Sequence, residues 1–170
     1  MPDESPSPFG SASQINQDLY AELKGESERA AAIFGAAVLD ELLRQVLVAS
    51  MIPDDEEVAK LTRESGALGT FAARIRAAYC LELISNEERH DLDTIRKIRN
   101  PFAHHIRPPS FSKGEIRELS LSLEIGKRFL NQEQRAFPRD SFQATTAALA
   151  YSLAVRSLQI KRERPQPRSD

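Results

Sequence analysis

The sequence predicts an all-α protein, a single-domain bundle of about five to seven helices. Apolar residues recur every three or four positions along several long segments, which is the period of an amphipathic helix. Alanine, leucine, glutamate and arginine are plentiful, only seven glycines are present, and no segment alternates apolar and polar residues as a strand does. The 170 residues correspond to one domain. We place the helical domain at residues 13–161, between a disordered Pro- and Ser-rich segment at residues 1–12 and a flexible charged tail at residues 162–170.

The first helices are predicted at residues 13–24 and 27–50, and the second of these is the longest. A serine at position 27 can cap it, and a glycine inside it, Gly35, indicates a close crossing with another helix. Asp40 and Arg44 are four residues apart and can form a weak ion pair of about 0.3–0.5 kcal/mol. Its expected apolar face consists of Phe34, Val38, Leu42 and Val46, backed by Leu39, Leu43 and Leu47.

The middle of the chain contains an acidic linker or short helix at residues 53–57 and a loop at residues 66–70. Thr70 is the expected cap of a helix over residues 71–83. Ser85-Asn-Glu-Glu88 has the pattern of a capping box, in which a serine and a glutamate each bind the backbone amide of the other. It predicts the start of a helix that runs to Arg99.

Prolines divide the last part of the chain. Pro101 has no amide proton and crowds the preceding turn, so we expect the helix to stop or kink there. A second capping-box pattern at residues 112–115 predicts a helix to about Asn131, and Pro138 introduces a last helix over residues 142–161.

Composition excludes several classes of protein. The net charge of −2 gives no general attraction to nucleic acid or to an anionic membrane. No signal peptide or apolar span is present, so we expect a cytoplasmic protein. Cys80 is the only cysteine and stands among alanines and leucines, which favours a buried, inert thiol. No Gly-rich phosphate loop and no standard metal-ligand spacing is present, so we expect neither a cofactor nor a metal.

The candidate site is the stretch from His90 to Arg107. No acidic residue occurs between Asp93 and Glu115, while cations and histidines are frequent. The polar candidates in this stretch are Arg96, Lys97, Arg99, Asn100, His104 and Arg107. Two interpretations remain open. The cations can complement the helix dipole, or Arg99 can pair with Asp40 or Glu41 of another helix. Alternatively, the cluster forms a polar binding or catalytic site.

A helix-turn-helix reading of residues 71–99 is disfavoured by charge. In that motif the second helix presents its first residues to DNA. Here those residues, 86–91, include three acids, which the phosphate backbone would repel. We therefore expect no direct DNA binding through this pair of helices.

Several blocks of the sequence, taken together, resemble the mannitol operon repressor (MltR) family. The blocks are Glu26-Ser-Glu-Arg29, Leu39-Asp-Glu-Leu-Leu43, Gly69-Thr-Phe-Ala-Ala-Arg-Ile75 and Leu92-Asp-Thr-Ile-Arg-Lys-Ile-Arg-Asn-Pro-Phe-Ala-His104. The resemblance covers roughly residues 13–160. It implies an all-helical bacterial transcriptional regulator without a recognised DNA-binding module, which would act through a partner protein, a ligand or a second copy of itself. Asp40 and Arg74, from two of these blocks, complete the candidate binding residues.

A more distant resemblance concerns Arg99-Asn-Pro-Phe-Ala-His104 alone. It is similar to the signature of HEPN domains, helical bundles that include metal-independent endoribonucleases. The resemblance implies a composite site across a dimer, in which His104 helps to activate a ribose 2′-hydroxyl and Arg99 stabilises charge on the phosphate. Asn100 would hold one of these side chains in place. A histidine titrates near neutrality and an arginine offers forked donors to phosphate, so this chemistry is sound. A binding regulator is our first hypothesis, and an RNA-cleaving enzyme is the alternative.

Overall fold

The computed structural model describes residues 12–107, 109–163 and 166. Within them the chain forms seven α-helices, two 3₁₀ helices and no strand, which confirms the predicted all-α bundle. The helices are α1 (Ala12–Gly25), α2 (Glu28–Ser50), α3 (Asp55–Thr62), α4 (Phe71–Cys80), α5 (Asn86–His104), α6 (Gly114–Leu121), η1 (Ile125–Phe129), η2 (Gln134–Ala136) and α7 (Pro138–Arg162). The predictions for residues 1–12 and 162–170 fall almost entirely outside the described residues.

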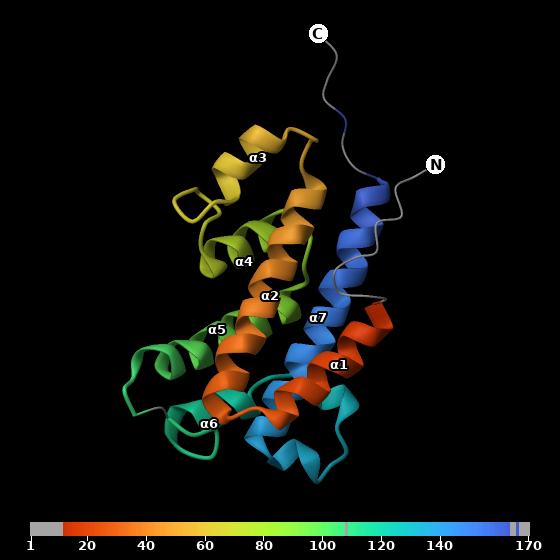
Figure 1. Ribbon diagram of the computed structural model, residues 1–170. Helices are drawn as coiled ribbons and strands as arrows, with labels where there is room; N and C mark the ends of the chain where they lie inside the picture. The colour runs from red at the N-terminus through yellow and green to blue at the C-terminus, as the bar shows by residue number, and fades with distance from the viewer. Residues whose placement is uncertain (1–11, 108, 164–165, 167–170) are drawn as a thin grey trace.

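The two longest helices, α2 and α7, lie side by side at the centre of the bundle (Figure 1). Helix α1 packs against α7 on one side, and α4 and α5 pack against α2 on the other. Helix α6 and the 3₁₀ helix η1 lie near the N-terminal part of α7. Helix α3 extends from the far end of α2. The outer surface of α5 is thereby left at one edge of the molecule.

The crossing of α2 and α7 depends on small residues. Gly35 of α2 faces Thr146 of α7, and a Cβ atom at Gly35 would lie 3.0 Å from the Thr146 methyl group. The predicted close crossing is therefore confirmed. The expected apolar face of α2 is buried except for Val38, which is partly buried, and Phe34, whose 37% exposure places it outside the core. The core lies on the leucine side of the helix instead, around Leu39 and Leu43.

Side-chain caps define most helix starts as predicted. Ser27 accepts the amide hydrogen of Ala30, and Thr70 accepts that of Ala73. Ser85 and Glu88 form both bonds of a capping box. The pattern at residues 112–115 forms no cap, because α6 begins at Gly114 after Lys113, which makes no capping bond. The Ser112 hydroxyl lies 2.9 Å from the Ser110 hydroxyl instead.

The helix was predicted to stop or kink at Pro101, and it does not stop there, because α5 passes through Pro101 and ends at His104. The amide of His105 donates to the carbonyl of Pro101 over 3.1 Å, which closes one more helical turn. Phe102 anchors that turn because it is fully buried and its ring centroid lies 5.1 Å from that of Phe111. Burial of an aromatic side chain therefore outweighs the single hydrogen bond that proline removes.

Two other helix limits differ from prediction. Helix α6 ends at Leu121 rather than near residue 131, because the following amides of Glu124 and Ile125 donate to the buried carboxylate of Asp91. Helix α7 begins at Pro138, four residues earlier than expected, with proline in the first turn where its missing amide costs least.

Two predicted details are also corrected. Cys80 is exposed because α4 ends at that residue and the chain turns through Glu82, whose φ is +57°. Arg44 pairs with Glu41 at 2.8 Å rather than with Asp40. No helix in the described part of the chain is long and apolar enough to cross a membrane.

Candidate functional site

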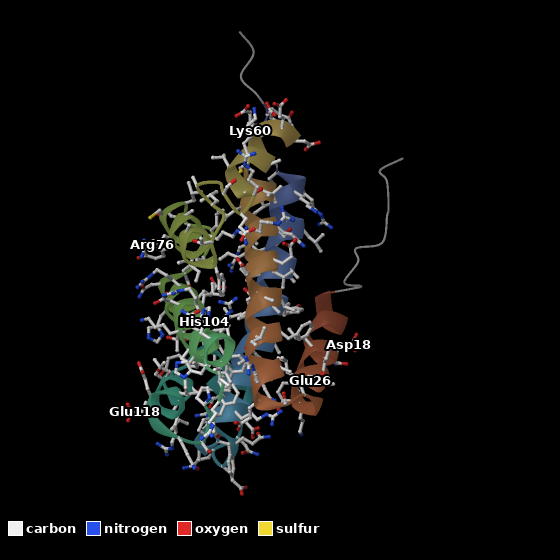
Figure 2. All side chains as sticks on the ribbon, turned by 60° about the vertical axis from the view of Figure 1, so that its left-hand side comes forward. Asp18, Glu26, Lys60, Arg76, His104 and Glu118 are labelled. Carbon is white, nitrogen blue, oxygen red and sulfur yellow. The ribbon has the colours of Figure 1, made fainter. Side chains whose placement is uncertain are left out.

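The inner side of α5 belongs to the core and its outer side carries the candidate residues. Leu92, Ile95 and Ile98 are fully buried. Successive residues of a helix are rotated by about 100° around its axis, and on this basis the four outer side chains of α5 lie within an arc of about 100° around the helix. We call this surface the α5 basic ridge; it consists of Arg96, Lys97, Asn100 and His104. Figure 2 shows His104 on the same side of α2 as Arg76 of α4, which adds a further exposed cation.

One carboxylate lies within the ridge and is neutralised there. Asp93 accepts hydrogen bonds from Arg96 at 2.8 Å and pairs with Lys97 at 3.0 Å. Partial burial opposes ionisation of Asp93, but the hydrogen bonds from Arg96 and Lys97 outweigh it and lower its pKa. Two cations thus share one anion, so the ridge keeps an excess of positive charge.

Arg99 and His104 do not converge within one chain. They are five residues apart on a continuous helix, which separates them by about 140° around its axis. The Arg99 guanidinium donates to the Asn100 amide oxygen over 3.4 Å, a long and weak contact. His104 is exposed at the last turn, and Arg107 is exposed beyond it. The motif therefore brings Arg99 to Asn100 and leaves His104 on another side of the helix.

Asp40 and Arg74 form a separate cluster between α2 and α4. The Arg74 guanidinium lies 2.7 Å from the Asp40 carboxylate, and its side chain is 10% exposed. It also donates to the carbonyls of Leu68 at 2.8 Å and Thr62 at 3.1 Å. One arginine thus joins α2, the end of α3 and the loop before α4. Arg74, and not Arg99, is the cation that pairs with Asp40.

The structure also reveals two buried acids in α5 that pattern analysis did not assign. Glu88, 8% exposed, binds Arg156 of α7 through two 3.0 Å contacts and accepts the Ser152 hydroxyl at 2.8 Å. Burial raises the pKa of Glu88, but the bonds from Arg156, the Ser85 amide and Ser152 outweigh this and lower it. A capping box is a local pattern, so it could not predict the long-range ion pair between Glu88 and Arg156.

Asp91 is the second buried acid and is fully enclosed. Its carboxylate accepts the amide of Ile125 at 2.8 Å and lies 3.1 Å from Nδ1 of His90. Together with Glu88 it holds the start of α5 against α7 and η1. In the part of α5 that a helix-turn-helix protein presents to DNA, Glu88 and Asp91 are therefore buried, while Asn86 and His90 are exposed. Within the described residues, no group of three or more His, Cys, Asp or Glu side chains is placed to hold a metal ion.

Fold and site together define a helical-bundle protein with a polar, cation-rich surface on one outer helix. Among solved structures, the one described as the X-ray structure of the MtlR-HPr complex from Escherichia coli is similar, with a TM-score of 0.58 and 20% sequence identity. The match covers 86% of this chain and 98% of that chain. The match shows a shared fold. No family model and no curated protein matches the sequence.

Proposed function

We propose that this chain is a cytoplasmic transcriptional regulator of the mannitol operon repressor type, which acts by binding a partner protein. The observation that carries the proposal is the likeness to a chain of the MtlR-HPr complex over nearly the full length of that chain. The acidic start of α5, where Glu88 and Asp91 are bound by the rest of the bundle, supports regulation through a partner rather than through a helix-turn-helix. HPr, or a protein like it, is the first partner to test.

We assign the partner contact to the α5 basic ridge with the neighbouring Arg99 and Arg107. The four side chains of the ridge share one outer surface, Arg99 contacts Asn100 beside it, and the carboxylate on the ridge is already neutralised. Charge complementarity then favours an acidic patch on the partner, and such patches mainly set specificity and the rate of association. Binding is preferred over RNA cleavage because α5 directs Arg99 and His104 about 140° apart.

The test is calorimetric titration of the chain with HPr, for wild type and for Lys97→Glu. We expect the variant to bind about tenfold more weakly, which corresponds to about 1.4 kcal/mol. Lys60→Glu is the matched control, because Lys60 is an exposed lysine on α3, at a different end of the molecule from His104 (Figure 2). Absence of binding by wild type, or equal losses in both variants, would contradict the proposal.

A parallel assay addresses the enzyme alternative. Purified chain is incubated with RNA in EDTA, beside the His104→Ala variant, and we expect both to leave the RNA intact. Cleavage by wild type that the variant lacks would make the chain a metal-independent nuclease instead.

A further inference from the structure

One side of α7 carries an apolar stripe that, within the described residues, no helix covers along its C-terminal half. Tyr151 is 41% exposed and Leu158 is 48% exposed, while the opposite side of α7 is buried in the core. Figure 1 shows α1 against the N-terminal part of α7 and no helix beside the outer edge of its C-terminal half. The stripe consists of Ala144, Ala147, Ala148, Tyr151, Val155 and Leu158; Ala144 and Ala147 are buried, and Ala148 and Val155 are partly exposed. Spacings of three and four residues are those of a helix that packs against another helix.

The N-terminal half of the stripe is hollow. Its three alanines form the floor of a cleft of about 360 Å³. Tyr20 of α1 and Phe129 of η1 also line the cleft, and Phe129 is 69% exposed. None of the side chains that line this cleft carries a formal charge. The cleft is therefore suited to an apolar side chain from a neighbouring helix.

The two ends of the stripe carry opposite charges. Asp140 and Arg162 lie on the same side of α7 as the stripe at about 100° per residue. Neither forms an ion pair within the described residues. Asp140 lies close enough to Tyr20 that, after burial, it is the second cause of the raised pKa of that phenol. It thus stands at the alanine end of the stripe, beside the cleft.

The stripe of one copy is complementary to the stripe of a second copy whose α7 runs in the opposite direction. If two copies of α7 run antiparallel with Tyr151 at the centre, Leu158 of one copy faces Ala144 of the other. In the same register Val155 faces Ala147, and Arg162 faces Asp140. Large side chains meet small ones, and each cation meets an anion, twice in the pair. We propose that the chain forms a two-fold dimer through this α7 stripe, with Leu158 of each copy seated in the cleft of the other.

The proposed dimer goes beyond partner binding, because it uses a different surface. In Figure 2, His104 of α5 lies on one side of α2 and Asp18 of α1 lies on the other side. The contact would extend about 33 Å along α7 between Asp140 and Arg162. A contact one helix wide is small for an interface between proteins, so we expect reversible association in the micromolar range.

The first test is sedimentation equilibrium over a range of concentrations. We expect a monomer–dimer equilibrium that Leu158→Glu abolishes. Leu81→Glu is the matched control, because Leu81 is 58% exposed and follows α4, away from the stripe. A chain that stays monomeric to millimolar concentration, or a dimer that Leu158→Glu leaves intact, would overturn the proposal. Circular dichroism of each variant verifies that the bundle is folded.

A charge exchange tests the register. Asp140→Arg and Arg162→Asp are each expected to weaken the dimer about tenfold, because like charges then meet twice. The double variant restores the opposite pairing and is expected to restore the dimer. A double variant as weak as the single ones would refute the antiparallel arrangement.

A crosslink tests the axis independently. In a Cys80→Ser background, Tyr151→Cys places one thiol near the proposed two-fold axis. We expect a disulfide-linked dimer under oxidising conditions, and none from Leu81→Cys in the same background. Equal crosslinking of the two variants would show that the copies do not meet at α7.

Discussion

Replacing Arg74 with alanine should destabilise the bundle more than any change to the α5 basic ridge. The guanidinium donates to the Asp40 carboxylate and to the carbonyls of Leu68 and Thr62. Thr62 is 7% exposed, so its carbonyl would lose a buried partner, at a cost of about 1–3 kcal/mol. The side chain of Asp40 is 30% exposed and can be hydrated, so its loss is smaller.

Together these losses amount to about 3–5 kcal/mol, the usual cost of breaking a buried ion pair from one side. A domain has only about 5–15 kcal/mol of stability, so the change is measurable by urea unfolding of wild type and Arg74→Ala. The loop at residues 63–70 should also exchange its amide hydrogens faster, because Leu68 is held from both sides by Leu61 and Arg74.

Arg74→Lys serves as the control for this prediction. A lysine keeps the charge near Asp40 but cannot reach three acceptors in a fixed fork, so it should recover only part of the stability. An Arg74→Ala variant within about 1 kcal/mol of wild type would refute the reasoning, since that is the range of exposed ion pairs. Unchanged stability with lost partner binding would instead make Arg74 part of the binding surface.

Two further predictions concern the core. Glu88→Gln should make the free energy of unfolding depend less on pH in the acid range. The native pKa of Glu88 lies below its ordinary value of 4.5, so the stabilisation by Glu88 is present above pH 4.5 and is lost as the pH falls through the native pKa. Urea unfolding at pH 7 and pH 3 measures this, and an unchanged difference between the two pH values would contradict it. Gly35→Val should cost about 1–3 kcal/mol, because even a Cβ atom would lie 3.0 Å from Thr146. A Gly35→Val variant as stable as wild type would mean that α2 and α7 can separate freely. Phe34→Val is the control for this variant at a surface position of the same helix.

The sequence predicted the elements that depend on local patterns. The caps at Ser27, Thr70 and Ser85 hold because a capping bond joins residues only three positions apart. The periodic apolar residues of α2 and α5 identified the helices and most of their buried sides. Gly35 was assigned correctly because a glycine within a long apolar helix has few other uses.

The failures arise where a distant residue decides the local structure. Pro101 does not end α5, because Phe102 packs against Phe111 on the far side of the intervening loop. Helix α6 stops early because Asp91, about thirty residues earlier in the chain, binds the amides of Glu124 and Ile125, which follow the end of the helix. The partner of Asp40 was sought one turn away at Arg44 and is found at Arg74 instead. No pattern within a short window contains these partners.

The charge of the candidate site also depends on contacts with distant residues, which a short stretch of sequence does not contain. The first half of α5 contains Glu88, Asp91 and Asp93, which look equivalent in the sequence. In the fold, Glu88 and Asp91 are directed inward and are bound by Arg156 and by backbone amides. Asp93 stays outside, where two cations share it. The outer surface of α5 is therefore basic in a chain whose net charge is −2.

This distribution links the two proposed surfaces. A dimer through α7 would leave both α5 basic ridges free, because they lie away from the α7 stripe. Two ridges on one assembly would bind two partner molecules, or one partner with two acidic sites far more tightly than a single ridge could. Leu158→Glu leaves the ridge intact but removes the dimer. The complex would then change from a dimer with two partner molecules to a monomer with one partner molecule, and the affinity of each ridge would stay the same. Lys97→Glu would do the reverse, lowering the affinity at each ridge while the dimer persists.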